Sequence, residues 1–188
     1  MAVRFAIPMT TEGATMTMLD SDKHYGLVSR AIHWTMAVLL LFMLSSDLWM
    51  HLYKDMTGQS AMPFHQGLGI ILAVLLVFRL IWRGINMDRV QPPEHWRKAA
   101  RLGHLALYAL MLIIPSSGLV MAGSSGHGID FFGVNLVAGG ERIEWLKEGA
   151  EEAHELATNL LWFVVAGHVL AALAHQYFLG DGTLRRMA

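Results

Sequence analysis

Two histidines, His154 and His168, lie in one long apolar stretch of this chain. Imidazole exchanges a proton near neutral pH and is a common ligand of metal ions, so both side chains are candidates for redox or proton chemistry. They are 14 residues apart, which on an α-helix corresponds to about 21 Å of rise and nearly a whole number of turns. They therefore point the same way at two depths. This spacing suits two metal cofactors stacked along one helix.

The elements that must position these histidines are four long apolar segments, over residues 31–50, 67–82, 102–122 and 156–178. As helices they are long enough, or nearly so, to cross a hydrocarbon core about 30 Å thick. The chain is 54% apolar and only 15% charged, whereas soluble domains are about 25% charged. Too little polar chain remains to wrap four such helices in water. The sequence therefore predicts an all-α integral membrane four-helix bundle.

The orientation follows from the distribution of charge. One side of the four predicted spans carries Lys23, Arg30, Arg79, Arg83, Arg89, Arg97, Lys98, Arg101, Arg185 and Arg186. The segment between the third and fourth spans carries six acids against two bases over residues 123–153. The positive-inside rule predicts that both termini and the Pro92–Pro93 loop lie in the cytoplasm. We expect a multi-pass membrane protein.

Outside the spans the sequence is less informative. Residues 1–20 have no apolar stretch of signal-peptide length, so we expect a loosely ordered tail followed by one transmembrane domain over residues 21–188. The chain has no cysteine, which excludes disulfides, iron–sulfur clusters and covalent haem attachment through Cys-x-x-Cys-His. From Glu141 the composition favours helix, which predicts an outward extension of the fourth span.

Two cofactors need opposing ligands at matching depths, and two further histidines supply them. His65 enters the second span from the outside, level with His154, and His33 begins the first span at the depth of His168. Neutral imidazole pairs facing each other across a bundle interior suit haem b. We therefore predict two b haems, one held by His33 and His168 and the other by His65 and His154.

Histidines occur inside membrane spans for several reasons. A single one is as often a hydrogen-bonded interfacial residue as a functional one. The segment "HELAT" lacks the second histidine of the zinc-protease helix motif. A zinc or copper transporter would add carboxylates or thioethers converging on the histidines. The only acid expected inside a span is Asp47, in the outer half of the first.

Two more histidines, His104 and His175, are expected near the cytoplasmic surface, where they are candidates for contact with a quinone or a haem propionate. Interfacial histidines facing lipid headgroups are an equal alternative. His175 lies seven residues beyond His168 on the same helical face and could replace it as ligand. It would then lie about 31 Å from His154, at the membrane surface, which favours His168.

Small residues accompany the predicted ligands and could let a flat macrocycle approach the backbone. Gly67 and Gly69 follow His65, and ordinary close helix packing accounts for them equally well. Pro115 and Gly118 in the third span predict a kink that opens space beside a cofactor.

The chain resembles the bacterial cytochrome b561 family of small four-helix di-haem quinone oxidoreductases over roughly residues 25–187. The resemblance rests on "YGLVSRAIHW", "FHQGLGIILAVLLVFRLIWR", "RLGHLALYALMLIIPSSGLVM", "FFGVNL", "HELATNLLWFVVAGHVLAALAHQYF" and "DGTLRRM". It implies that the positions of the four paired histidines are axial haem ligands. It also implies that His104 and His175 belong to a cytoplasmic side associated with quinone.

We therefore expect a haem-dependent oxidoreductase that carries electrons between an outer-face redox partner and the membrane quinone pool, with ubiquinone or another quinone as substrate. The family includes a superoxide oxidase, which passes electrons from superoxide to ubiquinone, and this is the first alternative. The acidic outer segment is a poor guide for an anionic substrate. A histidine-lined metal or proton transporter is the alternative from another class. No nucleic-acid partner is expected.

Overall fold

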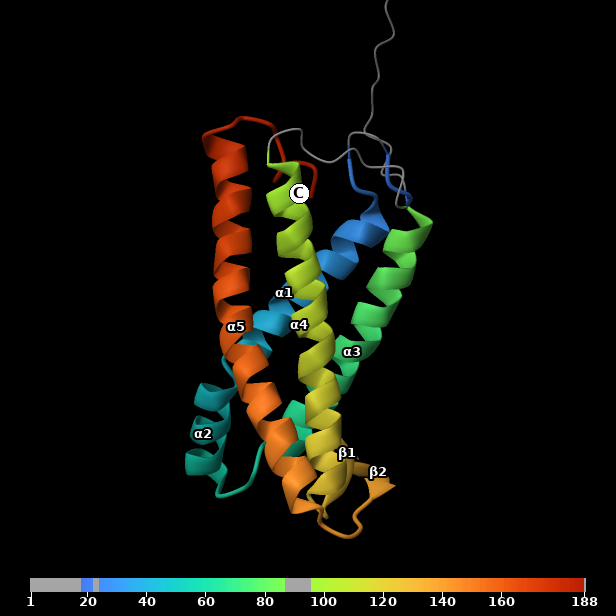
Figure 1. Ribbon diagram of the computed structural model, residues 1–188, viewed down its shortest axis with the longest axis vertical. Helices are drawn as coiled ribbons and strands as arrows, with labels where there is room; N and C mark the ends of the chain where they lie inside the picture. Colours follow the sequence, from blue (N-terminus) through green and yellow to red (C-terminus); the bar gives the residue numbers. More distant parts are fainter. Residues whose placement is uncertain (1–17, 22–23, 87–95, 188) are drawn as a thin grey trace, which may run out of the picture.

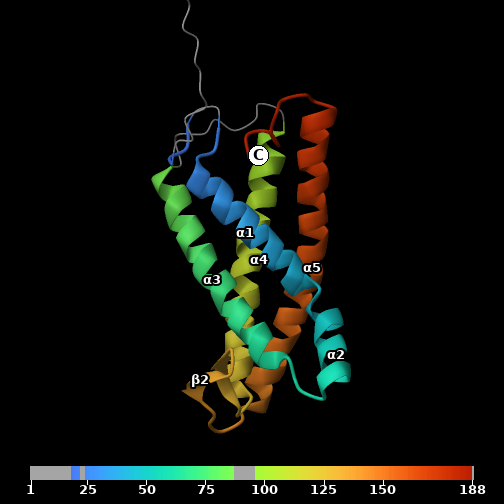
Figure 2. The same ribbon diagram turned by 180° about the vertical axis from the view of Figure 1, so that it is seen from behind.

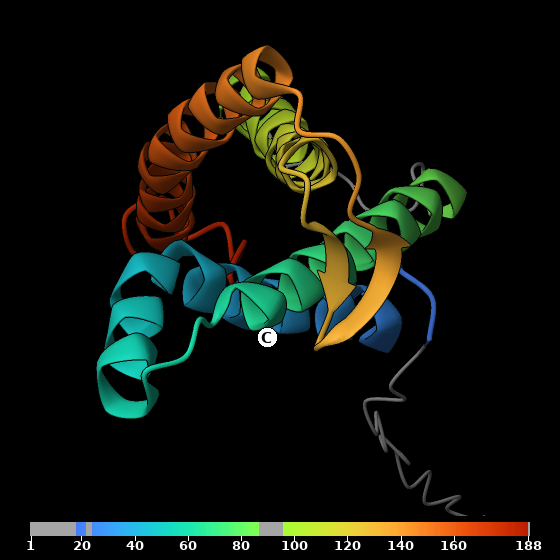
Figure 3. The same ribbon diagram turned by 90° about the horizontal axis from the view of Figure 1, so that it is seen from below.

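A computed structural model of the chain describes residues 18–21, 24–86 and 96–187. Within them lie five helices and one β-hairpin, in chain order α1 (Leu27–Leu44), α2 (Ser46–Thr57), α3 (Met62–Ile85), α4 (Arg97–Ser124), β1 (Gly128–Phe131), β2 (Val134–Ala138) and α5 (Glu144–Tyr177). Of the four long helices, α4 and α5 run roughly along the long axis of the molecule, whereas α3 is tilted and α1 crosses obliquely (Figures 1 and 2). Seen along that axis, α4 and α5 pack side by side on one side of the bundle and α1 and α3 on the other (Figure 3).

The predicted fold class is confirmed. Among the described residues, α1, α3, α4 and α5 are each long and apolar enough to cross a membrane. Many of their large apolar side chains point outward, as Val38, Val74 and Phe163 do at 63–77% exposure. Such exposure would be costly in water and is expected where lipid is the solvent. The interior is narrow, and Leu76 and Leu161 are its fully buried large side chains.

Both described chain ends lie at the same end of the bundle, which we call the inner end (Figure 1). The backbone N–H of Tyr25 donates to the carbonyl of Arg186, and the Trp34 indole N–H donates to the carbonyl of Met187. Asp20 is buried and accepts the backbone N–H of Gly26. The Pro92–Pro93 loop lies outside the described residues. The hairpin and α2 lie at the opposite, outer end.

The first span is shorter at its outer end than predicted. It begins at Leu27 and ends at Leu44, and the chain breaks at Ser45 before the separate helix α2. Asp47 therefore does not lie in the outer half of the first span: it belongs to α2, and its side chain is 95% exposed. The run of polar residues from Ser45 explains the break, because it ends the apolar stretch. The Trp49 ring then folds back and stacks on Phe42, with ring centroids 5.0 Å apart.

The segment between α4 and α5 contains a hairpin that the sequence did not predict. β1 and β2 pair antiparallel around Phe132 and Gly133, whose φ angles are 51° and 88°. Positive φ at both turn residues is the requirement of the tight hairpin turn that matches strand twist. Asp130 donates its backbone N–H to the side-chain oxygen of Gln66, which ties the hairpin to α3. The predicted outward extension of the last helix is present, because α5 begins at Glu144.

Candidate cofactor site

The outer histidine pair comes together across the bundle. The rings of His65 on α3 and His154 on α5 have centroids 6.2 Å apart. A metal–imidazole nitrogen bond is about 2.0 Å long and a ring centroid lies about 1.1 Å behind its nitrogen, so two imidazoles flanking one ion have centroids about 6.2 Å apart. The observed separation fits an ion between these two rings.

His154 is oriented by the neighbouring helix. Its Nδ1 lies 2.9 Å from the carbonyl oxygen of Ile114 and 3.2 Å from the hydroxyl of Ser117, both on α4. A carbonyl can only accept, so Nδ1 carries the proton and donates it. Nε2 is then left with a free lone pair, which is the state a metal ligand needs. A Cβ at Gly118 would lie 3.4 Å from the His154 ring, so the glycine makes room for this orientation.

His65 has the opposite character. Its Nδ1 is buried and has no hydrogen-bond partner among the described residues. Buried polar atoms in folded proteins almost always have a partner, so an orphan of this kind is a sign that a further group belongs there. The orphaned nitrogen lies in the ring that faces His154.

The inner pair is also present, with a third ring beside it. His33 on α1 and His168 on α5 have ring centroids 6.4 Å apart, which again fits a shared ion. His104 on α4 lies nearer to His168, with centroids 5.6 Å apart. That is too close for an ion between the two rings. The geometry therefore favours His33 over His104 as the partner of His168.

Arg79 is a site residue that the sequence analysis counted only as a positive charge. Its guanidinium lies 3.1 Å from Nδ1 of His33, so it donates to that nitrogen. The cation sits within an apolar helix, and that placement was the sequence signal for a specific role. Arg83, one turn further along α3, lies over the Tyr108 ring at 6.0 Å from the centroid. Two cations thus stand at the inner end near the three imidazoles.

The ring contacts among the described residues join His33, His104 and His168 but do not include His175. It is 8% exposed, and its Nδ1 lies 2.5 Å from a carboxylate oxygen of Asp181. Sequence reasoning missed Asp181, because its meeting with His175 depends on a turn after α5 that the periodicity of a helix does not reveal.

Other small residues differ in what they accommodate. A Cβ at Gly67 would lie 2.8 Å from the Phe132 ring, so this glycine admits the hairpin. At Gly69 the nearest atom would be 4.0 Å away, in Met43. The position over Gly118 is thus taken by the His154 ring and the position over Gly67 by the Phe132 ring.

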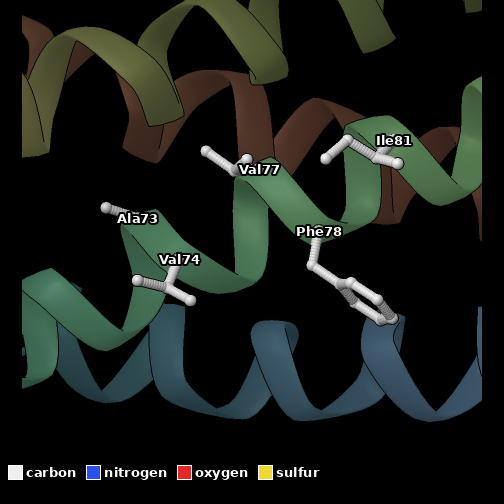
Figure 4. A pocket seen from close by; sticks show the side chains of 5 residues that line it. All are labelled: Ala73, Val74, Val77, Phe78 and Ile81. Carbon is white, nitrogen blue, oxygen red and sulfur yellow. The ribbon is translucent and has the colours of Figure 1, made fainter.

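An apolar groove lies away from the histidines. It has a volume of about 430 Å³ on the surface of α3 and is lined by Ala73, Val74, Val77, Phe78 and Ile81 (Figure 4). All five side chains are apolar, and Val74 and Val77 project outward from α3. The groove offers no polar group that could recognise a quinone head.

Two bases of the outer segment are held by acids. Arg142 binds Glu144 through two nitrogens, and Lys147 binds Glu151 at 2.6 Å. Both pairs are partly exposed. Neither base is therefore presented alone to an anion approaching the outer end.

Several known proteins are similar to this chain over most of its length. The family model described as prokaryotic cytochrome b561 matches residues 24–188. "Cytochrome b561 homolog 2" of Escherichia coli K12 is 34% identical over 92% of this chain and 95% of its own length. "Cytochrome b561 homolog 1" of the same organism is 36% identical over 65% of this chain and 72% of its own length. A Yersinia pestis protein named "Probable superoxide oxidase CybB" is 28% identical over 88% of this chain and 96% of its own length.

Proposed function

This chain belongs to the prokaryotic cytochrome b561 family of haem-binding membrane electron carriers, and from that premise we propose that it holds two b haems and carries electrons between an outer-face redox partner and the quinone pool of the bacterial inner membrane. The observation that carries the proposal is the pair of ring separations, 6.2 Å and 6.4 Å, at two depths of one bundle.

The ligand count supports haem rather than a bare ion. Among the described residues, no group of three or more His, Asp or Glu side chains is placed to hold a metal ion. Each pair offers two imidazoles, so the remaining ligands must come from a macrocycle. A metal transporter would need a fuller set of protein ligands, and the structure does not favour that alternative.

When bound, each haem would supply an iron that takes up and releases one electron. The two imidazoles of each pair would hold the iron between them and so keep water and oxygen from it. Ile114 and Ser117 hold the His154 ring in the ligating tautomer. Arg79 donates to Nδ1 of His33, so His33 would have to exchange this hydrogen bond for a proton on Nδ1 in order to ligate through Nε2.

The quinone is placed at the inner end, in the half of α5 that carries His168 and His175. His104 and His175 are the residues proposed to contact the quinone or a propionate. Histidine can pass protons to a quinone that is being reduced, because it titrates near neutral pH. We place this end, with both chain ends, in the cytoplasm on the positive-inside rule.

Superoxide oxidation is the second candidate, and the similarity to the Yersinia pestis protein supports it. The charges of this chain favour a different outer partner. Six acids surround two bases in the outer segment, and both bases are held in ion pairs. An anion would gain little electrostatic guidance toward this end.

One measurement tests the main proposal: the haem-to-protein ratio of the purified protein, with spectra before and after dithionite. We expect two haems per chain and a b-type reduced spectrum. A colourless, haem-free preparation, or one haem per chain, would contradict it.

A further inference from the structure

His175 has a built carboxylate partner. Its Nδ1 lies 2.5 Å from Oδ2 of Asp181, and the two side chains are only 10% and 20% exposed. Asp181 also donates its backbone N–H to the carbonyl of His175. The residue that follows α5 by four positions therefore folds back on the last turn of that helix and closes over the imidazole.

The carboxylate is itself fixed. Its second oxygen, Oδ1, accepts the backbone N–H of Thr183 at 3.0 Å and the Thr183 hydroxyl at 2.6 Å. Burial alone would raise the pKa of Asp181, but hydrogen bonds from Thr183 and His175 outweigh burial and hold this pKa below its usual range. Asp181 is therefore ionised at neutral pH, with one oxygen committed to Thr183 and the other to the imidazole.

The backbone around Asp181 is shaped for this position. Gly180 and Gly182 on either side of it have φ angles of 65° and 71°, a region that residues other than glycine rarely adopt. Further on, the carbonyls of Arg186 and Met187 are tied to Tyr25 and Trp34 at the start of the bundle. The segment is held at both ends, so the carboxylate cannot swing away without breaking several hydrogen bonds.

We propose that Asp181 is a positioning residue for proton transfer to the quinone, acting through His175. The inference rests on the proposed quinone function and deepens it. Because the ionised carboxylate accepts the Nδ1 proton, the Nε2 atom is the one turned to the quinone oxygen, and the carboxylate stabilises the imidazolium form.

The transfer is balanced in electrons and protons. A quinone becomes a quinol by taking two electrons, which the fully reduced di-haem protein stores, and two protons. Nε2 of His175 gives one of these protons to a quinone oxygen, forming an O–H bond as its N–H bond breaks. The neutral imidazole then recovers a proton from water at the inner surface, and the second quinone oxygen takes its proton from the same water. The Nδ1 proton stays on the imidazole throughout and is donated to Asp181.

Asp181 could instead serve only to hold the chain after α5 in place, a role that we call a staple. The Asp181 variants would then behave differently. A staple would affect stability and haem retention but not the maximal rate per haem. Asp20 provides a matched control, since it is also a carboxylate at the inner end and is buried. It accepts the backbone N–H of Gly26 at 2.8 Å and does not contact a histidine in that hydrogen bond.

The experiment follows oxidation of the dithionite-reduced protein by a short-chain ubiquinone in a stopped-flow instrument, at several quinone concentrations. For Asp181→Asn we expect both haems to be retained, a half-saturating quinone concentration within about twofold of wild type, and a maximal rate lower by about 10- to 100-fold. An asparagine can donate to Nδ1 and so favour the wrong tautomer. Asp181→Glu should recover most of the rate, and Asp20→Asn should keep it.

A second readout does not depend on turnover. In ¹⁵N-histidine-labelled, reduced protein, the His175 signals, identified by their loss in His175→Gln, should show a protonated Nδ1 in wild type and an unprotonated one in Asp181→Asn. If Asp181→Asn loses haem, Thr183→Val removes only the hydroxyl bond to the carboxylate and should still slow the maximal rate about threefold.

The outcomes separate the two proposals. A wild-type maximal rate in Asp181→Asn, together with a slow His175→Gln, overturns the role of Asp181 and leaves the quinone function standing. A wild-type rate in both variants places the quinone elsewhere and overturns both ideas. Equal losses of stability and haem in Asp181→Asn and Asp20→Asn, at an unchanged maximal rate per haem, would show that Asp181 is a staple only.

Discussion

At the level of single residues, the four paired histidines are held in unequal ways. His154 donates to a carbonyl, His65 has an orphaned nitrogen, and His33 accepts from Arg79. A ligand that is pre-oriented loses less freedom on binding the metal. Of the three rings, that of His154 is therefore the one already oriented to bind iron before a haem is present.

The ligand pairs predict which haem each substitution removes. His33→Ala or His168→Ala should abolish the inner haem, and His65→Ala or His154→Ala the outer one, because one imidazole cannot replace both axial bonds. The ratio of haem to protein should fall from two to one, and redox titration should show one remaining component. Retention of both haems in His168→Ala with loss in His175→Ala would mean that the wrong residue was assigned.

Gly118 offers a subtler test at the same scale. Its missing side chain leaves room for the His154 ring, whereas Gly123 on the same helix has open space around its Cβ position. Gly118→Val should displace the ring and weaken or remove the outer haem, and Gly123→Val should not. The haem content of the two purified variants is the measurement. Equal haem content would show that the ring position does not depend on this glycine.

At the level of elements, the hairpin is held on α3 by the ring of Phe132, which we call the aromatic plug. The Phe132 ring fills the space over Gly67 and makes an edge contact with Phe64, at 6.1 Å between centroids. Gly67, which the Phe132 ring covers, is two residues from His65 in the sequence. The hairpin thus covers the outer end of the helix that carries one predicted ligand.

A side chain at Gly67 should push this plug out. We expect Gly67→Val to lower stability by about 1–3 kcal/mol, as overpacking typically does, while Gly69→Val, with its nearest neighbour at 4.0 Å, should change it little. Thermal unfolding and proteolysis at the hairpin would measure the two effects. Identical behaviour of the two variants would contradict the plug.

The elements also show what the sequence could and could not predict. The four spans depend on local hydropathy, and the shared face of His154 and His168 depends on helical spacing within one element, so both could be predicted. The first turn of the separate helix α2 was included in the predicted first span, because the apolar residues Leu48, Trp49 and Met50 follow the short polar run. The Phe132–Gly133 turn and the Asp181–His175 contact were missed, because each depends on positive-φ backbone and on distant segments meeting.

At the scale of the whole molecule, the two ends of the bundle differ in charge. The acidic outer segment with its paired bases contrasts with the basic residues gathered by α3 and α4 at the inner end. Charge patterns of this extent act on the rate of encounter, and salt screens them over about 10 Å at 0.1 M.

Small charged probes should report this asymmetry. We expect a cationic metal complex to oxidise or reduce the outer haem faster than an anionic one at low ionic strength. Added salt should slow the cation and leave superoxide and other anions unslowed. Stopped-flow rates across a salt series provide the test. A superoxide reaction that is fast and falls steeply with salt would mean that local bases dominate.

The hydrogen bonds from Tyr25 and Trp34 to the carbonyls of Arg186 and Met187 have a consequence for biogenesis. The ribosome releases the first span long before residues 186 and 187, so the indole of Trp34 must wait in the membrane for its acceptor until all four spans have been made. The inner half can then close only as a late event. A chain interrupted after α5 would carry every predicted haem ligand and still lack this closure, which gives the cell a structural mark of incomplete synthesis.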